Sequence, residues 1–501
     1  MARKIYKFHG GVKVADFKEP STTTPIGRIP PPEVLIVPLR QHLGIPARSV
    51  ASIGQYVKKH QMIAKAVAGR LSSTVHAPVS GEIIDIKNHP IIHQSGMDDV
   101  CIFIKNDDKY TKVATAGNDD FAKLGKEELF DKIQSAGIVG LGGAGFPSDI
   151  KALGGMKNKI ETLIINGAEC EPYISCDDLL MRERAADIIQ GIKIIKKIVE
   201  PDKILVAIED NKPEAIEELK NKNNDNQIEI ISIPTIYPSG SERQLIKILT
   251  NKEIRAGTIP ADIGILCFNV ATAFAVYEAV AYAKPLIERV VTITGDKCEK
   301  AGNYTVTIGT PISHIADFLG FKPANGIICG GPMMGFKINS LLAPVSKTCN
   351  CLLVLGVDFA NNVAPSPCIR CGKCAEVCPA RLLPQQLYWY CKGKDFANAE
   401  NYDLVNCIEC NCCTHVCPSN IPLVAYYKSA KMQIRNLELK RKKSEHAKIR
   451  YENRTARLER LKKERQALRQ QQRSAMQKKQ NNKAKIIQQA QKRIEQQKNG
   501  Q

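Results

Sequence analysis

Eight cysteines in the last third of the chain have the spacing of iron–sulfur ligands. They form two runs with the pattern Cys-x2-Cys-x2-Cys-x3-Cys-Pro, and the second run begins 39 residues after the first. A cubane [4Fe–4S] cluster presents four irons, and each iron takes one thiolate from the protein. Three cysteines at this close spacing can wrap one cluster from a single short loop. The runs comprise Cys368, Cys371, Cys374 and Cys378, and then Cys407, Cys410, Cys413 and Cys417.

The fourth cysteine of each run is set apart by three residues and precedes a proline, as in the two-cluster ferredoxins of bacteria. In those proteins the fourth cysteine ligates the other cluster. The pattern therefore predicts two [4Fe–4S] clusters with crossed ligation. The first would be held by Cys368, Cys371, Cys374 and Cys417, and the second by Cys378, Cys407, Cys410 and Cys413.

Zinc and disulfide bonds are the alternatives for these cysteines. Structural zinc sites usually take pairs of ligands separated by a longer finger, whereas each run here packs three cysteines into seven residues. Disulfides suit small secreted domains, and this is a long chain in which we expect no secretion signal. Iron–sulfur clusters in a reducing compartment are therefore favoured. We expect Cys412, which is off register, to be a bystander, and we expect packing roles for Cys329, Cys349, Cys351 and Cys391.

The positive charge of the chain is concentrated at its C-terminal end. Residues 431–501 contain 23 of the 71 Lys and Arg but only 6 of the 51 Asp and Glu, and the whole chain has a net charge of +20. These residues are mostly good helix formers with few apolar anchors, so we expect a solvated helix or partial disorder. Attraction to an anionic membrane surface is the favoured role. Nucleic-acid binding is the weaker alternative, because aromatic side chains do not interleave with the basic ones.

The most apolar stretch, Ile263–Ala283, does not have the composition of a membrane span. It contains Asn269, Thr272 and Glu278, whereas a spanning helix needs about 20 mostly apolar residues. We expect a buried strand followed by a buried helix. Any membrane association is then expected to be peripheral.

Short apolar segments bounded by Gly and Pro extend from Glu33 to about Lys105 and predict a compact β domain. The turn Ala77-Pro78-Val79-Ser80-Gly81, followed by a strand, resembles the biotinyl/lipoyl-type sandwich. Those carriers need a lysine at a hairpin tip, and residues 66–86 contain none. The segment is similar to the scaffold without its swinging arm.

A glycine-rich segment follows a predicted helix over Glu127–Ser135. Gly140, Gly142 and Gly145 match G-x-G-x-x-G by spacing, but a dinucleotide fingerprint should follow a strand rather than a helix. Glycines let backbone N–H groups approach a phosphate closely, and Lys151 could supply a positive charge. The segment is predicted either to bind a phosphate group or to be a tight structural loop.

Strand and helix patterns alternate after this loop. The apolar strand Thr162–Asn166 ends in a segment with Glu169 and Glu171, and α/β folds bind ligands at such carboxyl ends. Alternation of this kind predicts a largely parallel sheet with helices on both faces. The further elements are helix 186–199, strand 203–208, helix 213–221, strand 228–233 and strand 263–269.

Several motifs in one order carry a family resemblance over roughly residues 5–430. That order is similar to the FMN- and NADH-binding flavoprotein subunit of respiratory complex I, and more closely to the C subunit of the Rnf ion-translocating oxidoreductases. Leu141 and Ala168 depart from complex I, which has arginine and aspartate there, but resemble the Rnf branch. The motifs are Gly-Gly-Ala-Gly-Phe-Pro (142–147) with Lys151, Asn166-x2-Glu169-x-Glu171-Pro172, Tyr237-x2-Gly240-x-Glu242, Asn269-Val270-x-Thr272 and Gly330-Gly-Pro-Met-Met-Gly335.

The resemblance implies FMN on the glycine loop and NADH beside it. For FMN the implied residues are Gly140, Gly142, Gly143, Gly145, Lys151, Asn166, Asn269 and Thr272, and for NADH they are Glu169, Glu171, Tyr237, Gly240 and Glu242. It also implies a β-grasp (SLBB) domain. The expected architecture is a multidomain α/β protein: an N-terminal β sandwich-hybrid domain (1–115), a Rossmann-like α/β FMN/NADH domain (116–288), a β-grasp domain (289–348), an α-rich two-cluster ferredoxin module (349–430) and a basic tail (431–501).

The resemblance implies an electron-input subunit of a membrane-bound oxidoreductase. NADH would exchange electrons with FMN and the clusters, and partner subunits, with ferredoxin as a further candidate partner, would couple this flow to ion transport. The expected location is peripheral, on the cytoplasmic face of the bacterial inner membrane. The rival hypothesis is a non-catalytic ferredoxin-type relay on a scaffold that docks through the basic tail. The flavoprotein of a soluble NADH dehydrogenase or hydrogenase is disfavoured, because such chains usually carry one cluster after the α/β part.

Overall fold

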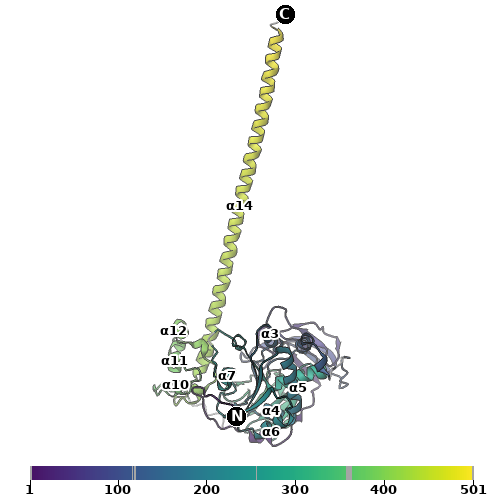
Figure 1. Ribbon diagram of the computed structural model, residues 1–501, viewed down its shortest axis with the longest axis vertical. Helices are drawn as coiled ribbons and strands as arrows, with labels where there is room; N and C mark the ends of the chain where they lie inside the picture. The colour runs from purple at the N-terminus through teal and green to yellow at the C-terminus, as the bar shows by residue number, and fades with distance from the viewer. Residues whose placement is uncertain (1–2, 115–116, 118–119, 255–256, 357–363, 499–501) are drawn as a thin grey trace. The chain divides into compact units, whose positions relative to one another are not determined.

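The computed structural model describes residues 3–114, 117, 120–254, 257–356 and 364–498. The chain up to Lys428 forms one compact unit, and the residues from Ser429 onwards belong to a second. Figure 1 shows the sheets and short helices of the first unit, and α14 (Leu423–Lys498) as one uninterrupted helix.

Two small antiparallel sheets form the N-terminal β region. One has the strand order β2-β8-β7-β4 and the other β3-β5-β6. Leu35, Val57, Ile63 and Ile104 are fully buried in one core that both sheets share. The compact β domain predicted from Glu33 to Lys105 is therefore present. Its strands are β2 (Val34–Pro38), β3 (Arg48–Ser49), β4 (Tyr56–Val57), β5 (Met62–Lys65), β6 (Val75–His76), β7 (Gly81–Pro90) and β8 (Asp98–Asn106).

A parallel four-stranded sheet with the order β11-β10-β9-β12 lies at the centre of the α/β region. Three of its strands, β9, β10 and β12, are continuous apolar runs over most of their length, as expected for strands covered on both faces, whereas the edge strand β11 contains Glu229 and Ser232. The chain moves outward from β9 to β11 and then returns to the other side of β9. The topological switch point, where such sheets bind ligands, therefore lies between β9 and β12. The strands are β9 (Thr162–Gly167), β10 (Lys203–Glu209), β11 (Ile228–Ile233) and β12 (Ile265–Asn269).

Helices cover both faces of this sheet. Alternate strand residues such as Ile164 and Leu205 pack against α7, whereas Leu163 and Val206 face the core that contains α5 and α8. In α5 the isoleucines recur at helical spacing and are buried, so its apolar stripe explains its place on the sheet. The helices are α2 (Lys126–Ser135), α3 (Ser148–Lys157), α4 (Cys176–Glu183), α5 (Ala185–Val199), α6 (Pro213–Lys222), α7 (Glu242–Thr250) and α8 (Val270–Ala281).

A six-stranded sheet follows, with the order β1-β14-β13-β17-β15-β16. β1 comes from the N-terminal segment and pairs in parallel with β14. Helix α9 (Ile312–Leu319) packs its buried side chains into the core of this sheet. Assignment to the β-grasp class stays a prediction. The strands are β1 (Gly27–Arg28), β13 (Glu288–Thr294), β14 (Gly302–Thr307), β15 (Ile327–Cys329), β16 (Phe336–Lys337) and β17 (Cys351–Val354).

The cysteine-rich module repeats one backbone conformation 39 residues apart. Left-handed residues at Arg370, Gly372 and Arg381 recur at Glu409, Asn411 and Asn420. In both copies a short helix follows the second of these residues and contains the third cysteine of the run. The doubled cysteine pattern therefore corresponds to a doubled structure. Its helices are α10 (Lys373–Glu376), α11 (Pro384–Gly393), α12 (Phe396–Asn401) and α13 (Cys412–His415).

The basic C-terminal segment, for which helix and disorder were both expected, is helical as far as Lys498. From Leu437 to Gln496 its side chains are all exposed. In the ranges that the structure describes, no helix combines the length and the apolar content needed to cross a bilayer.

Candidate functional site

The eight predicted cluster ligands gather in two cavities, each of which combines both runs. The space between atoms is about 410 Å³ at the first cavity and about 340 Å³ at the second, and part of it is open to solvent. Because each cavity takes its fourth cysteine from the other run, the arrangement suits crossed ligation. The assignment of ligands stays a prediction. Cys368, Cys371, Cys374 and Cys417 line the first cavity, and Cys378, Cys407, Cys410 and Cys413 line the second.

The chemistry of the two cavities fits iron–sulfur clusters. Among the described residues that line them there is no histidine, aspartate or glutamate, so thiols are the available metal ligands. Burial raises the pKa of Cys374, Cys378 and Cys413. Since iron binds the thiolate, a bound metal centre must offset this cost of burial.

Cys412, the expected bystander, is fully buried and also lines the second cavity. Its side chain is hydrogen-bonded to Cys410, and this bond lowers the pKa of Cys410. The role of Cys412 as a bystander stays a prediction, and the spacing of the run does not reveal this contact.

The glycine loop between α2 and α3 presents three free backbone donors. Within the described chain, the N–H groups of Gly142, Gly143 and Ala144 make no hydrogen bond, and these residues are exposed. Gly143 has a φ of +104°, and a Cβ atom there would meet nothing within 4 Å. Successive free N–H groups in such a loop form an anion-binding concavity. The loop therefore fits the phosphate group of FMN.

Two buried contacts hold this loop from its inner side. The N–H of Leu141 donates to Thr272 Oγ1 at 3.0 Å, and Arg289 donates to the carbonyl of Leu141 at 3.1 Å. Arg289 also donates to the backbone carbonyl of Lys347. Thr272 is 1% exposed and Leu141 is 4% exposed, so water does not compete for these bonds. The free donors of the loop are thus held in place before any ligand binds.

Asn166 and Asn269 meet at the switch point of the sheet, where they are register partners on β9 and β12. Asn166 donates to the carbonyl of Gly240 at 2.9 Å. A Cβ atom on Gly142 would lie 3.4 Å from Asn269, so the glycine loop packs directly against this point. The structure therefore brings together four of the sequence motifs.

Lys151 and Glu242 form an ion pair at 2.9 Å, and Lys151 also donates to the carbonyl of Cys267 at 2.8 Å. Both side chains of the pair are partly exposed. Lys151 was predicted to supply a counter-charge to phosphate. In this structure its ammonium group already has two acceptors, so that role stays a prediction.

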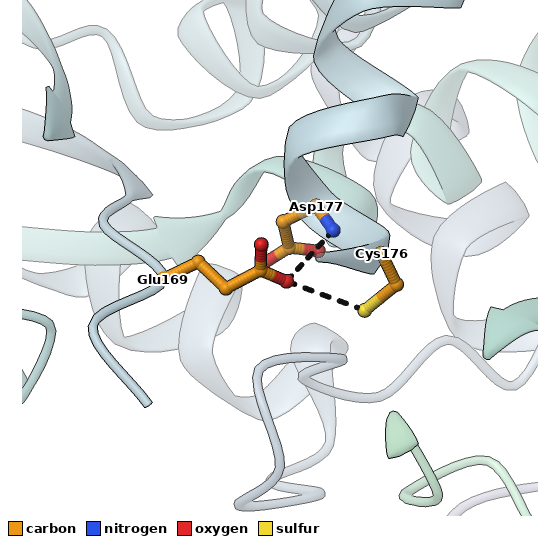
Figure 2. Close-up of side chains that lie close together, drawn as sticks. All are labelled: Glu169, Cys176 and Asp177. Carbon is orange, nitrogen blue, oxygen red and sulfur yellow. Dashed lines mark hydrogen bonds between the residues drawn. The ribbon is translucent and has the colours of Figure 1, made fainter. Parts of the chain in front are cut away.

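Figure 2 shows that Glu169 points toward the start of α4, where Cys176 and Asp177 lie. Its carboxylate accepts hydrogen bonds from the N–H of Asp177 at 2.9 Å and from Cys176 Sγ at 3.5 Å. The ammonium group of Lys18 lies 3.9 Å away and donates to the carbonyls of Glu169 and Ile174. Glu169 is 7% exposed, so its carboxylate is buried and bound by groups of the protein itself. Its expected role beside the nicotinamide stays a prediction.

The carboxyl group of Asp177 is buried beside Glu169. Burial, together with the charge of Glu169, raises the pKa of Asp177 to about 7. Asn269 donates to Asp177 at 2.6 Å. Through this hydrogen bond the switch point contacts the carboxyl group of Asp177, which can hold or release a proton near neutral pH.

The second cysteine cavity abuts the α/β region through Tyr237. This side chain was expected in the nucleotide site, but it is 2% exposed and its hydroxyl donates to the carbonyl of Cys410 at 2.8 Å. Asn411 donates to the carbonyl of Met333, whose N–H donates to Glu171 at 2.6 Å. Glu171 therefore also binds backbone N–H groups. Its nucleotide contact, like that of Tyr237, stays a prediction.

Lys347 is a buried lysine near the glycine loop that sequence reasoning missed. It is 1% exposed and donates to the carbonyls of Thr74 and Gly137, each at 2.7 Å. Burial lowers its pKa to about 7. The residue joins the β sandwich to the chain just before the glycine loop. A lone lysine in a sequence gives no signal of such burial.

Three family models match this chain. The Nuo51 FMN-binding domain matches residues 133–278, the RnfC barrel sandwich hybrid domain matches residues 6–109, and the 4Fe-4S dicluster domain matches residues 367–421. They confirm the predictions of an FMN-binding domain, an N-terminal sandwich-hybrid domain and a two-cluster domain.

Curated relatives match most of the chain. The C subunit of the ion-translocating oxidoreductase complex of Haemophilus influenzae (strain PittEE) is 46% identical over 90% of this chain and 70% of its own length. The proteins of the same name from Pseudomonas aeruginosa and Edwardsiella ictaluri are each 46% identical over 90% of this chain, which spans 59% and 57% of their lengths. A solved NAD⁺-reducing [NiFe]-hydrogenase in the H₂-reduced state is 16% identical, with a TM-score of 0.46 over 64% of this chain and 63% of that one.

Proposed function

The chain belongs to the RnfC family, the C subunits of ion-translocating oxidoreductase complexes, and from this membership we propose that it is the electron-input subunit of such a complex. It exchanges electrons with NADH through FMN and two [4Fe–4S] clusters, and partner subunits couple this exchange to ion transport. One observation carries the proposal: a loop of free N–H donors and two four-cysteine cavities occur in a single compact unit. Bound FMN would accept a hydride and give up single electrons, which the clusters can carry.

The residues of the chain have distinct tasks in this proposal. The N–H groups of Gly142, Gly143 and Ala144 bind the flavin phosphate, and Thr272 keeps them aligned. Asn166 and Asn269 orient the flavin at the switch point. Because these donors are fixed in advance, binding requires little rearrangement of the loop.

Asp177 supplies a proton-holding group close to this site. Its pKa of about 7 lets it take up or release a proton in the physiological range. Glu169 and the ammonium group of Lys18 set the local charge. The hydrogen bond from Asn269 holds Asp177 at the switch point.

The two cysteine cavities are proposed to be inner and outer sites. The hydroxyl of Tyr237 donates from the α/β region to the carbonyl of Cys410, which lines the second cavity (the Cys378 cavity), and this contact supports the role of that cavity as the inner site. The Cys368 cavity includes Cys371, which is exposed, and Ile369, which is 68% exposed. This cavity is the one that a redox partner can approach. Other subunits of the complex, or a ferredoxin, are the proposed partners.

The basic helix α14 is proposed to bring the protein to an anionic membrane surface. Its excess of Lys and Arg supports this, since each basic residue near such a surface contributes about 1 kcal/mol. The proposed location is then peripheral, on the cytoplasmic face of the bacterial inner membrane.

The rival hypothesis is a non-catalytic ferredoxin-type relay whose α/β region binds no cofactor. Cofactor content separates the two. The proposal predicts about eight iron atoms per chain, two cubanes' worth, together with one bound FMN. Purified protein with about four irons or fewer and no flavin would refute it. Iron for two clusters without any flavin would favour the relay.

A further inference from the structure

The acidic side chains of α14 lie mainly on one side of the helix. Four glutamates recur every seven residues, and at about 100° per residue each such step returns to within about 20° of the same direction. A fifth glutamate falls in the same arc. Glu464 lies outside it and is 3.6 Å from Arg460. We call this side the glutamate face, and its members are Glu438, Glu445, Glu452, Glu459 and Glu495.

The apolar side chains gather on the opposite side. They lie about 100–180° from the centre of the glutamate face, counted at about 100° per residue. Tyr451 is 71% exposed and Leu468 is 57% exposed, so the described chain does not cover this side. Among the exposed apolar residues from Leu437 onwards, Leu437 and Ile449 lie on the side of the glutamates, and the half-buried Ile434 lies on that side near the start of the helix. We call the side opposite the glutamates the apolar face, and it contains Leu439, Tyr451, Leu458, Leu461, Leu468, Met476, Ile486, Ile487 and Ile494.

Basic residues share the apolar face. From Leu437 onwards, ten Lys and Arg fall in the same 100–180° arc, counted at about 100° per residue, and Arg450, Arg454 and Arg465 are three of them. Their stems are apolar, and their charged ends can extend away from a buried surface to reach polar groups. The face therefore combines apolar contact with positive charge along its length.

The combination of apolar and basic side chains on one face distinguishes among the partners that this face could bind. In a coiled coil with a second copy, Arg454 and Arg465 would lie in the seam, where apolar residues are required. Nucleic acid would use the arginines but would leave the apolar side chains in water. An anionic lipid surface accepts both, because apolar side chains enter the headgroup boundary and arginines reach the phosphates.

We propose that α14 lies along an anionic lipid surface with its apolar face toward the lipid and its glutamate face toward water. The inference rests on the proposed function only for the membrane setting, and it adds the orientation of the helix and the residues that carry it. Glutamates on the lipid side would be repelled, so the placement of most of them on the far side is what such an orientation requires.

Sedimentation of the full chain with vesicles tests this inference. The probes are vesicles of phosphatidylcholine with phosphatidylglycerol, and vesicles of phosphatidylcholine alone. The chain should bind the first strongly and the second weakly, and added salt should weaken binding. The double variant Leu458→Gln/Leu461→Gln should bind the anionic vesicles at least about tenfold more weakly.

Matched controls come from the other side of the helix. Leu437→Gln/Ile449→Gln removes the same kind of side chain near the glutamate face and should leave binding unchanged. Arg454→Gln/Arg465→Gln should weaken binding more than Arg441→Gln/Lys463→Gln, although both remove two charges. All these positions are exposed, so the substitutions should not disturb folding.

Three results would overturn the inference. Equal effects of the paired variants would indicate attraction without orientation. Dimerisation that depends on Leu458 and Leu461 would indicate that the apolar face binds a second copy of the chain. Preferential binding of nucleic acid over vesicles would indicate that the basic side chains bind nucleic acid and not lipid. Iron content and NADH-dependent flavin bleaching, measured on the same samples, report on the proposed function independently of vesicle binding.

Discussion

Replacing Thr272 with valine should loosen the glycine loop and weaken FMN binding while leaving the cysteine module intact. The two side chains have nearly the same shape, so the main change is the loss of one acceptor. The N–H of Leu141, now 3.0 Å from Thr272 Oγ1, would stay buried without a partner. Such a loss costs about 1–3 kcal/mol. If about 1.4 kcal/mol of this appears in ligand binding, the Kd for FMN rises about tenfold.

Fluorescence titration of FMN into the flavin-depleted chain measures this Kd, and urea unfolding measures stability. Thr292→Val is the matched control, because Thr292 is also fully buried and accepts the N–H of Ser175 at 3.0 Å. It should lower stability at least as much but leave the Kd for FMN nearly unchanged. Equal Kd values in the two variants and the unsubstituted chain would refute the assignment of the glycine loop to the flavin phosphate.

Three further substitutions test other parts of the account. Cys371→Ser should lower iron from about eight to about four atoms per chain, whereas Cys391→Ser should not, as iron assays would show. Lys347, with a pKa of about 7 in the fold, loses its proton there at lower pH than in the unfolded chain, so its own contribution to stability should rise from about pH 7 to 10.5 by up to about 1.4 kcal/mol per pH unit. Buried cysteines such as Cys101 and Cys267, whose pKa burial raises to about 12, lower the stability of both chains in the upper part of this range. The measurement is therefore the difference in urea unfolding between the unsubstituted chain and Lys347→Met, which should grow with pH in favour of the unsubstituted chain. Tyr237→Phe removes the hydrogen bond to Cys410, worth about 0.5–1.5 kcal/mol, and should slow NADH-dependent cluster reduction in stopped-flow spectra without slowing flavin bleaching.

Local patterns explain how much of the fold was predictable. The predicted strand 228–233 matches β11, and the predicted helix 213–221 is α6 with one further residue. The predicted strand 263–269 begins two residues later, because Pro260–Ile263 form a short 3₁₀ helix. Continuous apolar runs and proline positions determine these elements over a few residues, so the sequence alone reveals them.

Contacts between distant segments explain what was missed. Lys18 and Glu169 are 151 residues apart, and Lys347 and Thr74 are 273 residues apart. A charged side chain in a sequence predicts exposure, yet both lysines are buried because backbone carbonyls surround them. The assignment of Tyr237 to the nucleotide site came from a resemblance and stays a prediction, and nothing in the sequence indicated that its hydroxyl also contacts the cysteine module. The two groups of four cysteines could be predicted from the sequence, because each run supplies three closely spaced cysteines from one loop and a fourth that is set apart.

An anaerobic visible spectrum of the purified chain, before and after addition of NADH, tests the central claim most directly. We expect broad cluster absorbance at roughly 400 nm together with a flavin band, and both should bleach when NADH is added. Cluster absorbance that NADH does not change, with no flavin band, would contradict the account and leave a ferredoxin-type module on an inert scaffold.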